Sequence, residues 1–217
     1  MTHNKEYVVD FWKKYSPDHI MPDVGKKFPE GWNVSKFLKK IIKKETVTEV
    51  GCGYGRLCKG FTKKQYFGFD ISSESIGLAK DLYPGYQFSE MGYDEKVGET
   101  DWHLFYTVLL HVRDENLGEV IQLITSNKII VGEIMDKKWR EAEKDVPVFN
   151  RNANEYIGAF EDNGFIFVER IDKPYERYQL LKELEQNKDD ENIEDIDFEI
   201  GDKSTNVSFL IFKRKGS

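Results

Sequence analysis

"TVTEVGCGYGRL", residues 46–57, decides the fold of this chain. Its first five residues are rich in β-branched side chains, which is typical of a strand. Glycines follow at positions 51, 53 and 55, and residues 55–62 are expected to begin a helix. Glycine lets the backbone turn sharply and lets a ligand approach it closely. The order of strand, glycine turn and helix therefore indicates either a ligand-binding loop or a plain tight turn.

The rest of the chain continues this alternation of strands and helices. Short apolar runs predict strands, and helical periodicity or a capping residue such as Ser72 predicts helices. We expect strands at 65–70, 86–88, 101–108, 128–134, 165–171 and 206–215, and helices at 4–15, 34–44, 72–83, 114–126 and 152–165. Gly164 should end the last helix in a left-handed conformation. The pattern predicts an α/β, doubly wound, mostly parallel seven-stranded sheet with an antiparallel edge strand.

Length and composition limit the class of protein. At 217 residues the chain is expected to form a single domain over 1–217. It has no apolar run long enough to cross a bilayer and no signal-peptide pattern, so a cytoplasmic location is expected and a membrane partner is not. The two cysteines, Cys52 and Cys58, suggest neither a disulfide framework nor a zinc site. No metal is implied.

Charge is unevenly distributed along the chain. The net charge is −7, and the acids gather in residues 183–203, whereas residues 26–44 are locally basic. A broad basic face is missing, and nucleic acids are bound mainly through lysine and arginine contacts to phosphates. This composition favours a small-molecule partner over a nucleic acid.

The glycine loop departs from two well-known nucleotide motifs. The dinucleotide fingerprint needs a third glycine or alanine where Arg56 stands, and the phosphate-loop motif needs a Gly-Lys-Ser/Thr sequence that is missing. What remains is an acid, Glu49, before Gly51, Gly53 and Gly55. A negative charge at the end of a strand is unfavourable for a pyrophosphate and favourable for a cationic ligand.

On these residues the chain resembles the class I S-adenosylmethionine (SAM) dependent methyltransferases, from about residue 46 to 170. "EVGCGYGRL" is similar to their first motif, and "FGFDIS" places Asp70 where such enzymes bind the ribose hydroxyls with an acid. Alone, Asp70 could equally cap the helix that begins near Ser72. "DWHLFYTVLLHVRD", residues 101–114, is similar to their fourth-strand motif. Two departures are Glu in place of Asp at positions 49 and 90.

The resemblance implies SAM as cofactor and a set of residues around it. Glu90 is expected near the adenine amino group, with Met91 along one face of the ring and Ile71 along the other. The cofactor-binding residues implied are Glu49, Gly51, Cys52, Gly53, Gly55, Asp70, Ile71, Glu90, Met91 and Tyr106.

His111 is the candidate catalytic residue. It follows the fourth strand, where a histidine can remove a proton from a hydroxyl or amine at neutral pH. It could instead pack at the helix start or only orient the substrate. His103 alternates into the interior and is expected to be a core residue with satisfied hydrogen bonds.

Substrate contacts are expected from segments outside the core motifs. We divide the domain into an N-terminal helical substrate cap (1–45), a SAM-binding core (46–173), an acidic insertion (174–204) and a last strand with its tail (205–217). Candidate substrate residues are Tyr15, His19, Phe28, Trp32, Trp139 and Arg140.

The function expected is transfer of a methyl group from SAM to an oxygen or nitrogen of a small molecule. Two alternatives stay open. A nucleic-acid methyltransferase could use the lysines of residues 26–44, and a non-catalytic SAM-binding or scaffold protein could use the acidic segment to bind a partner.

Overall fold

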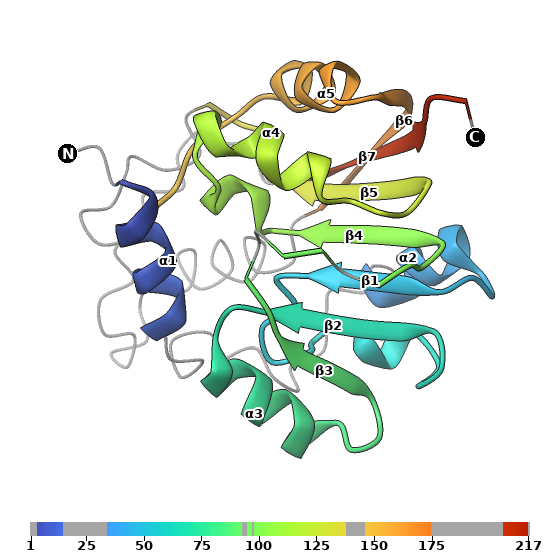
Figure 1. The fold of residues 1–217 in the computed structure, drawn as a ribbon. Coiled ribbons are helices and arrows are strands. Elements are labelled where there is room, and N and C mark those ends of the chain that lie inside the picture. The colour runs from blue at the N-terminus through green and yellow to red at the C-terminus, as the bar shows by residue number, and fades with distance from the viewer. Residues whose placement is uncertain are drawn as a thin grey trace, which may run out of the picture.

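The protein contains one seven-stranded sheet with helices on both faces (Figure 1). The structure is a computed structural model, and it describes residues 4–14, 34–92, 95–96, 98–137, 146–174 and 206–216. The strands are β1 (Val47–Val50), β2 (Tyr66–Asp70), β3 (Gln87–Glu90), β4 (Trp102–Tyr106), β5 (Lys128–Glu133), β6 (Phe165–Pro174) and β7 (Asn206–Arg214). The helices are α1 (Lys5–Lys14), α2 (Val34–Ile42), α3 (Ser73–Leu82), α4 (Asp114–Gln122) and α5 (Ala153–Asp162).

The strand order is β3-β2-β1-β4-β5-β7-β6, and the first five strands are parallel. β7 is antiparallel to both β5 and β6. The predicted α/β, mostly parallel sheet is confirmed, and so is the antiparallel pairing of the two late strands. The antiparallel strand itself lies one position inside the edge, which β6 forms.

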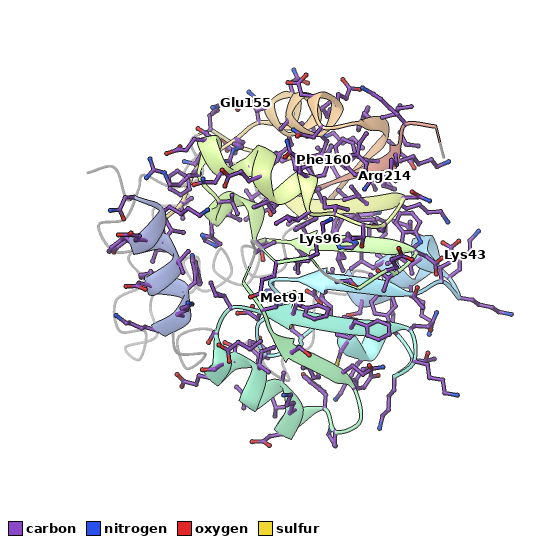
Figure 2. The ribbon with its side chains drawn as sticks, in the orientation of Figure 1. Lys43, Met91, Lys96, Glu155, Phe160 and Arg214 are labelled. Carbon is purple, nitrogen blue, oxygen red and sulfur yellow. The ribbon has the colours of Figure 1, made fainter. Side chains whose placement is uncertain are left out.

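Two apolar cores lie on opposite faces of the sheet. One joins the sheet to α2 and α3, and the other joins it to α4 and α5. In the second core Phe160 points from α5 toward the sheet (Figure 2) and stacks on Phe212 at 4.4 Å between ring centroids. Ser72 caps α3 as predicted, and Gly164 has the predicted positive φ of 87°. No helix within the described ranges is long and apolar enough to cross a membrane.

The helix predicted directly after the glycine turn is wrong. Only a short 3-10 helix, η3 (Cys58–Gly60), forms there. A Cβ on Gly60 would lie 2.6 Å from the Cβ of Ser35, so α2 packs directly on this segment. α2 occupies the side of the sheet where a longer helix would have to lie, and its buried residues Val34, Leu38 and Ile42 make it part of the core rather than of the cap.

The connection from β3 to β4 crosses the sheet without a helix in its described residues, 91–92, 95–96 and 98–101. Figure 2 labels Met91 at its start and Lys96 farther along it. Parallel strands of one sheet are usually joined by a crossover that contains a helix. Here Thr100 contacts the sheet instead, with its hydroxyl 3.1 Å from the hydroxyl of Thr48.

Candidate functional site

A cavity of about 350 Å³ opens at the carboxyl ends of the parallel strands. This is the edge at which doubly wound sheets bind their ligands. α1 lies beyond the ends of β1, β2 and β4 (Figure 1) and lines the cavity with Lys5, Val8, Val9 and Trp12. Of the sequence-predicted site residues in the described ranges, the cavity brings together Gly51, Cys52, Gly53, Asp70, Ile71, Met91, Tyr106 and His111.

The glycine turn forms the floor of the cavity. Gly51 and Gly53 have φ values of 73° and 54°, in the left-handed region that favours glycine. A Cβ on Gly53 would meet nothing within 4 Å, whereas a Cβ on Gly51 would lie 2.3 Å from Val108. Gly51 is therefore required by packing as well as by its backbone conformation, and Gly53 leaves space open above the turn.

Asp70, at the end of β2, joins the glycine turn to α3. Its Oδ2 accepts from the Gly53 N–H at 2.7 Å and its Oδ1 accepts from the Ser72 N–H at 2.9 Å. Burial raises the pKa of Asp70, and these backbone hydrogen bonds oppose the shift. A third backbone hydrogen bond, from Ile71, acts in the same direction. A carboxylate has about four acceptor sites, so Asp70 keeps acceptor capacity for a ligand.

Three predicted cofactor residues do not line the cavity. Glu49 points into the core that contains α2 and α3, where it accepts a hydrogen bond from the Tyr66 hydroxyl. Burial raises the pKa of Glu49 to about 7. Gly55 is fixed by packing, because a Cβ there would lie 2.7 Å from the Phe88 ring. Glu90 ends an edge strand, and its side chain is exposed.

A strained residue that the sequence did not reveal directly follows β4. Thr107 has a φ of 54°, which is a rare conformation for a β-branched side chain. Its hydroxyl accepts a hydrogen bond from Arg56 at 2.6 Å, and the guanidinium of Arg56 lies 4.7 Å from the centre of the Tyr106 ring. Strained residues of this kind cluster at functional sites.

His111 lines the cavity, is half-buried and has a defined proton arrangement. Its Nδ1 is 2.7 Å from the carbonyl oxygen of Pro147. Because a carbonyl oxygen only accepts, Nδ1 carries a proton, and in the neutral ring the lone pair is on Nε2. The Trp12 ring packs on His111, with 4.2 Å between the ring centroids. Trp12 thus links α1 to the candidate catalytic residue.

Glu133, at the end of β5, holds the backbone just before His111. Its Oε1 accepts from the N–H groups of Val108 and Leu109, at 2.9 and 2.6 Å. The carboxyl group is fully buried, which raises its pKa to about 7.

Arg151 holds the same loop by its carbonyl groups. Its guanidinium donates to the carbonyl oxygens of Leu109 and Val112 and to the carboxylate of Asp114, and only 3% of its side chain is exposed. Residues 107–114 are thus held from two sides, and we call Glu133 and Arg151 together the loop clamp.

Several expected residues lie outside the described part of the chain. These are Tyr15, His19, Phe28, Trp32, Trp139 and Arg140, together with residues 175–205 of the acidic insertion and the last-strand segment. Sequence reasoning missed Arg56, Thr107 and the loop clamp as site residues. Trp12 was not predicted as a site residue either, and the one signal in the sequence is its place among the aromatic residues of the N-terminal segment.

Comparison with known proteins relates this architecture to methyltransferases. No protein-family model and no curated protein matches the sequence. Magnesium protoporphyrin IX methyltransferase from Synechocystis PCC 6803, crystallised with SAM, matches with a TM-score of 0.61 at 16% identity over 99% of this chain and 98% of that one.

Two further solved structures are similar. A putative methyltransferase of Haloferax volcanii, solved in complex with the Trm112 activator, has a TM-score of 0.63 at 14% identity over 95% of this chain and 97% of its own. The [4+2]-cyclase SpnF has a TM-score of 0.61 at 16% identity over 83% and 80% of the two chains. The chain therefore has the Rossmann-like fold of the class I SAM-dependent methyltransferases.

Proposed function

We propose that the protein transfers a methyl group from SAM to an oxygen or nitrogen atom of a small-molecule acceptor. The observation that carries this proposal is the single cavity in which Asp70 and the open turn at Gly53 lie together with His111. When bound, SAM supplies a methyl group already activated by its positively charged sulfur. Catalysis then depends mainly on orientation and on exclusion of water.

The residues of the cavity fit the parts of this cofactor. Asp70 would accept hydrogen bonds from the two ribose hydroxyls with the lone pairs that its backbone contacts leave available. Ile71 and Met91 would flank the adenine ring. The Arg56 guanidinium would bind the carboxylate at the other end of the molecule.

His111 would act on the acceptor rather than on the cofactor. With Nδ1 donating to Pro147, Nε2 is the atom that can take a proton from a hydroxyl or amine as it is methylated. The Trp12 ring and the apolar side chains of α1 would exclude water from the reacting atoms. The SpnF likeness shows why the site must be tested, since the same fold also occurs in a cyclase.

The cofactor assignment predicts a thermal shift. SAM or its demethylated product, S-adenosylhomocysteine (SAH), at about a hundred times its Kd should stabilise the protein by about 2.7 kcal/mol and raise Tm by about 5–10 °C. Asp70→Ala should abolish the shift, measured by differential scanning fluorimetry. The control Asp81→Ala removes a carboxylate from the exposed side of α3 and should keep it. A wild type that responds to neither compound would exclude the cofactor.

The catalytic assignment predicts a separation of binding from turnover. A panel of small alcohols, phenols and amines would first be screened for SAH release with SAM present. With the acceptor found, His111→Gln should lower kcat about a hundredfold or more and leave SAM affinity unchanged, because the histidine acts on the acceptor. Unchanged kcat would refute the role as base, and turnover of RNA instead of any small molecule would refute the acceptor class.

A further inference from the structure

The cavity extends well beyond the carboxyl edge, along one side of α4. Asn116 and Val120, which line it, are four residues apart on α4 and so share one face of the helix, and Val112 lines it from the loop just before the helix. α4 has nine residues and is about 13 Å long. We call the deep part of this cavity the inner channel, and it is lined by Val50, Phe69, His103, Phe105, Val120, Leu123 and Ile124.

The wall opposite α4 is a row of apolar side chains on the sheet. Phe69, Val50 and Phe105 are register partners on β2, β1 and β4, so they stand side by side on one face. Above them runs the β3–β4 connection, whose described residues form no helix and of which Met91, Gly92 and Glu95 line the cavity. No helix from the described part of this connection packs along α4.

His103 is the polar group at the inner end of the channel. It is 1% exposed, and its Nδ1 lies 2.8 Å from the hydroxyl of Ser126. That hydroxyl donates its own proton to the carbonyl oxygen of Lys128 at 3.0 Å. Ser126 must therefore accept from His103, so Nδ1 carries the proton and Nε2 carries the lone pair.

The Nε2 atom of His103 has no hydrogen-bond partner among the described residues. His103 is thus a core residue as predicted, but only one of its two ring nitrogens has a hydrogen-bond partner among the described residues. Burial lowers its pKa to about 4, so the ring is neutral at physiological pH. An unpaired acceptor in an apolar channel costs free energy, and a ligand that brings an O–H or N–H group would remove this cost.

We infer that the inner channel holds the far end of the methyl acceptor, an elongated, uncharged and mostly apolar molecule with an O–H or N–H donor at the end opposite the methylated atom. This inference rests on the proposed function. His111 and the His103 ring line the same cavity, so one elongated molecule is expected to reach from the first to the second. Its apolar walls would exclude a charged group, whose desolvation would not be compensated there.

The test uses two probes of nearly the same shape, 4-propylphenol and 4-propyltoluene, which differ by a hydroxyl in place of a methyl group. Isothermal titration calorimetry without cofactor should show the phenol binding wild type about tenfold more tightly, the effect of one buried hydrogen bond. His103→Leu should reduce this ratio to about one. If that variant does not fold, Ser126→Ala replaces it in the test. It removes the group that keeps the proton on Nδ1, and it should also lower the ratio of the two affinities.

A second pair of variants tests the location. Leu123→Trp should fill the channel and abolish binding of both probes. Leu82→Trp adds the same ring on the exposed side of α3 and should leave binding unchanged. Equal affinity of wild type for the two probes would overturn the inference.

Titration with SAH on the same samples separates this inference from the proposed function. Failure of SAH to bind wild type would contradict the cofactor, and the probe titrations would still report on the channel. Simultaneous binding of SAH and 4-propylphenol is expected. Mutual exclusion would overturn the inference, because it would assign the channel to the cofactor.

Discussion

Gly51 shows how a single residue fixes the floor of the cavity. Its φ of 73° and the 2.3 Å approach of a Cβ to Val108 both exclude a side chain. We expect Gly51→Ala to destabilise the protein by about 2–4 kcal/mol, the sum of backbone strain and overpacking. Urea unfolding would measure the change.

A glycine elsewhere provides the matched control. Gly158 lies within α5, and a Cβ there would meet nothing within 4 Å. Gly158→Ala should stabilise the protein by about 0.5–1 kcal/mol, because alanine favours the helix. If both variants changed the free energy of unfolding in the same direction, close packing would not explain why a glycine stands at position 51.

At the scale of elements, the loop clamp joins β5 and the segment before α5 to the loop between β4 and α4. We expect Arg151→Met to destabilise the protein by about 3 kcal/mol, because it removes the guanidinium donors to the carbonyl groups of Leu109 and Val112. The substitution should speed up amide hydrogen exchange at residues 108–113 more than it does in β5. Arg151→Lys keeps the charge without the planar fork, so it should be intermediate. Protection unchanged in Arg151→Met would mean that the loop is held by other contacts.

The elements differ in how far the sequence predicted them, for a physical reason. α3 and α5 begin and end close to their predicted positions because their signals are local, namely Ser72 at one N-cap and Gly164 after a C-terminus. The short η3 was missed because α2, from a distant part of the chain, packs against Gly60. The place of β7 between β5 and β6 also depends on pairing that no local pattern contains.

The same distinction applies to the site. Asp70 and His111 could be placed at the carboxyl edge of the sheet because one ends a recognisable strand and the other comes shortly after a second strand. Glu133 and Arg151 were missed because they act on a loop about 20 to 40 residues away in the chain, and only the fold brings them to it. His103 was placed correctly in the interior, but its unpaired Nε2 depends on Ser126 and on the cavity, which sequence alternation does not show.

At the scale of the whole molecule, two buried carboxyl groups make stability depend on pH. Glu133 and Glu49 lie on opposite faces of the sheet, and burial raises each pKa from 4.5 to about 7. Between these values the folded state holds protons that the unfolded state has released. The contribution of these two groups to the free energy of unfolding should therefore fall as pH rises from about 5 to 7 and then level off.

Substitution tests this pH dependence. Glu133→Gln should remove up to about 3 kcal/mol of the decrease, and adding Glu49→Gln should remove a similar part, since the sheet separates the two sites. Urea unfolding at pH 5 and pH 8 would measure both. Glu161→Gln, on the exposed surface of α5, serves as the control. The same pH dependence in wild type and the double variant would show that neither carboxyl group is responsible.

The position of β7 has a consequence for synthesis of the chain. β5 and β6 do not pair with each other, because β7 lies between them, and β7 is the last of the seven strands to leave the ribosome. Until residues 206–214 emerge, the nascent sheet exposes the unpaired backbone groups of β5, which can pair with other chains. The late strand thus closes the sheet and ends the period in which the growing polypeptide is most prone to aggregate.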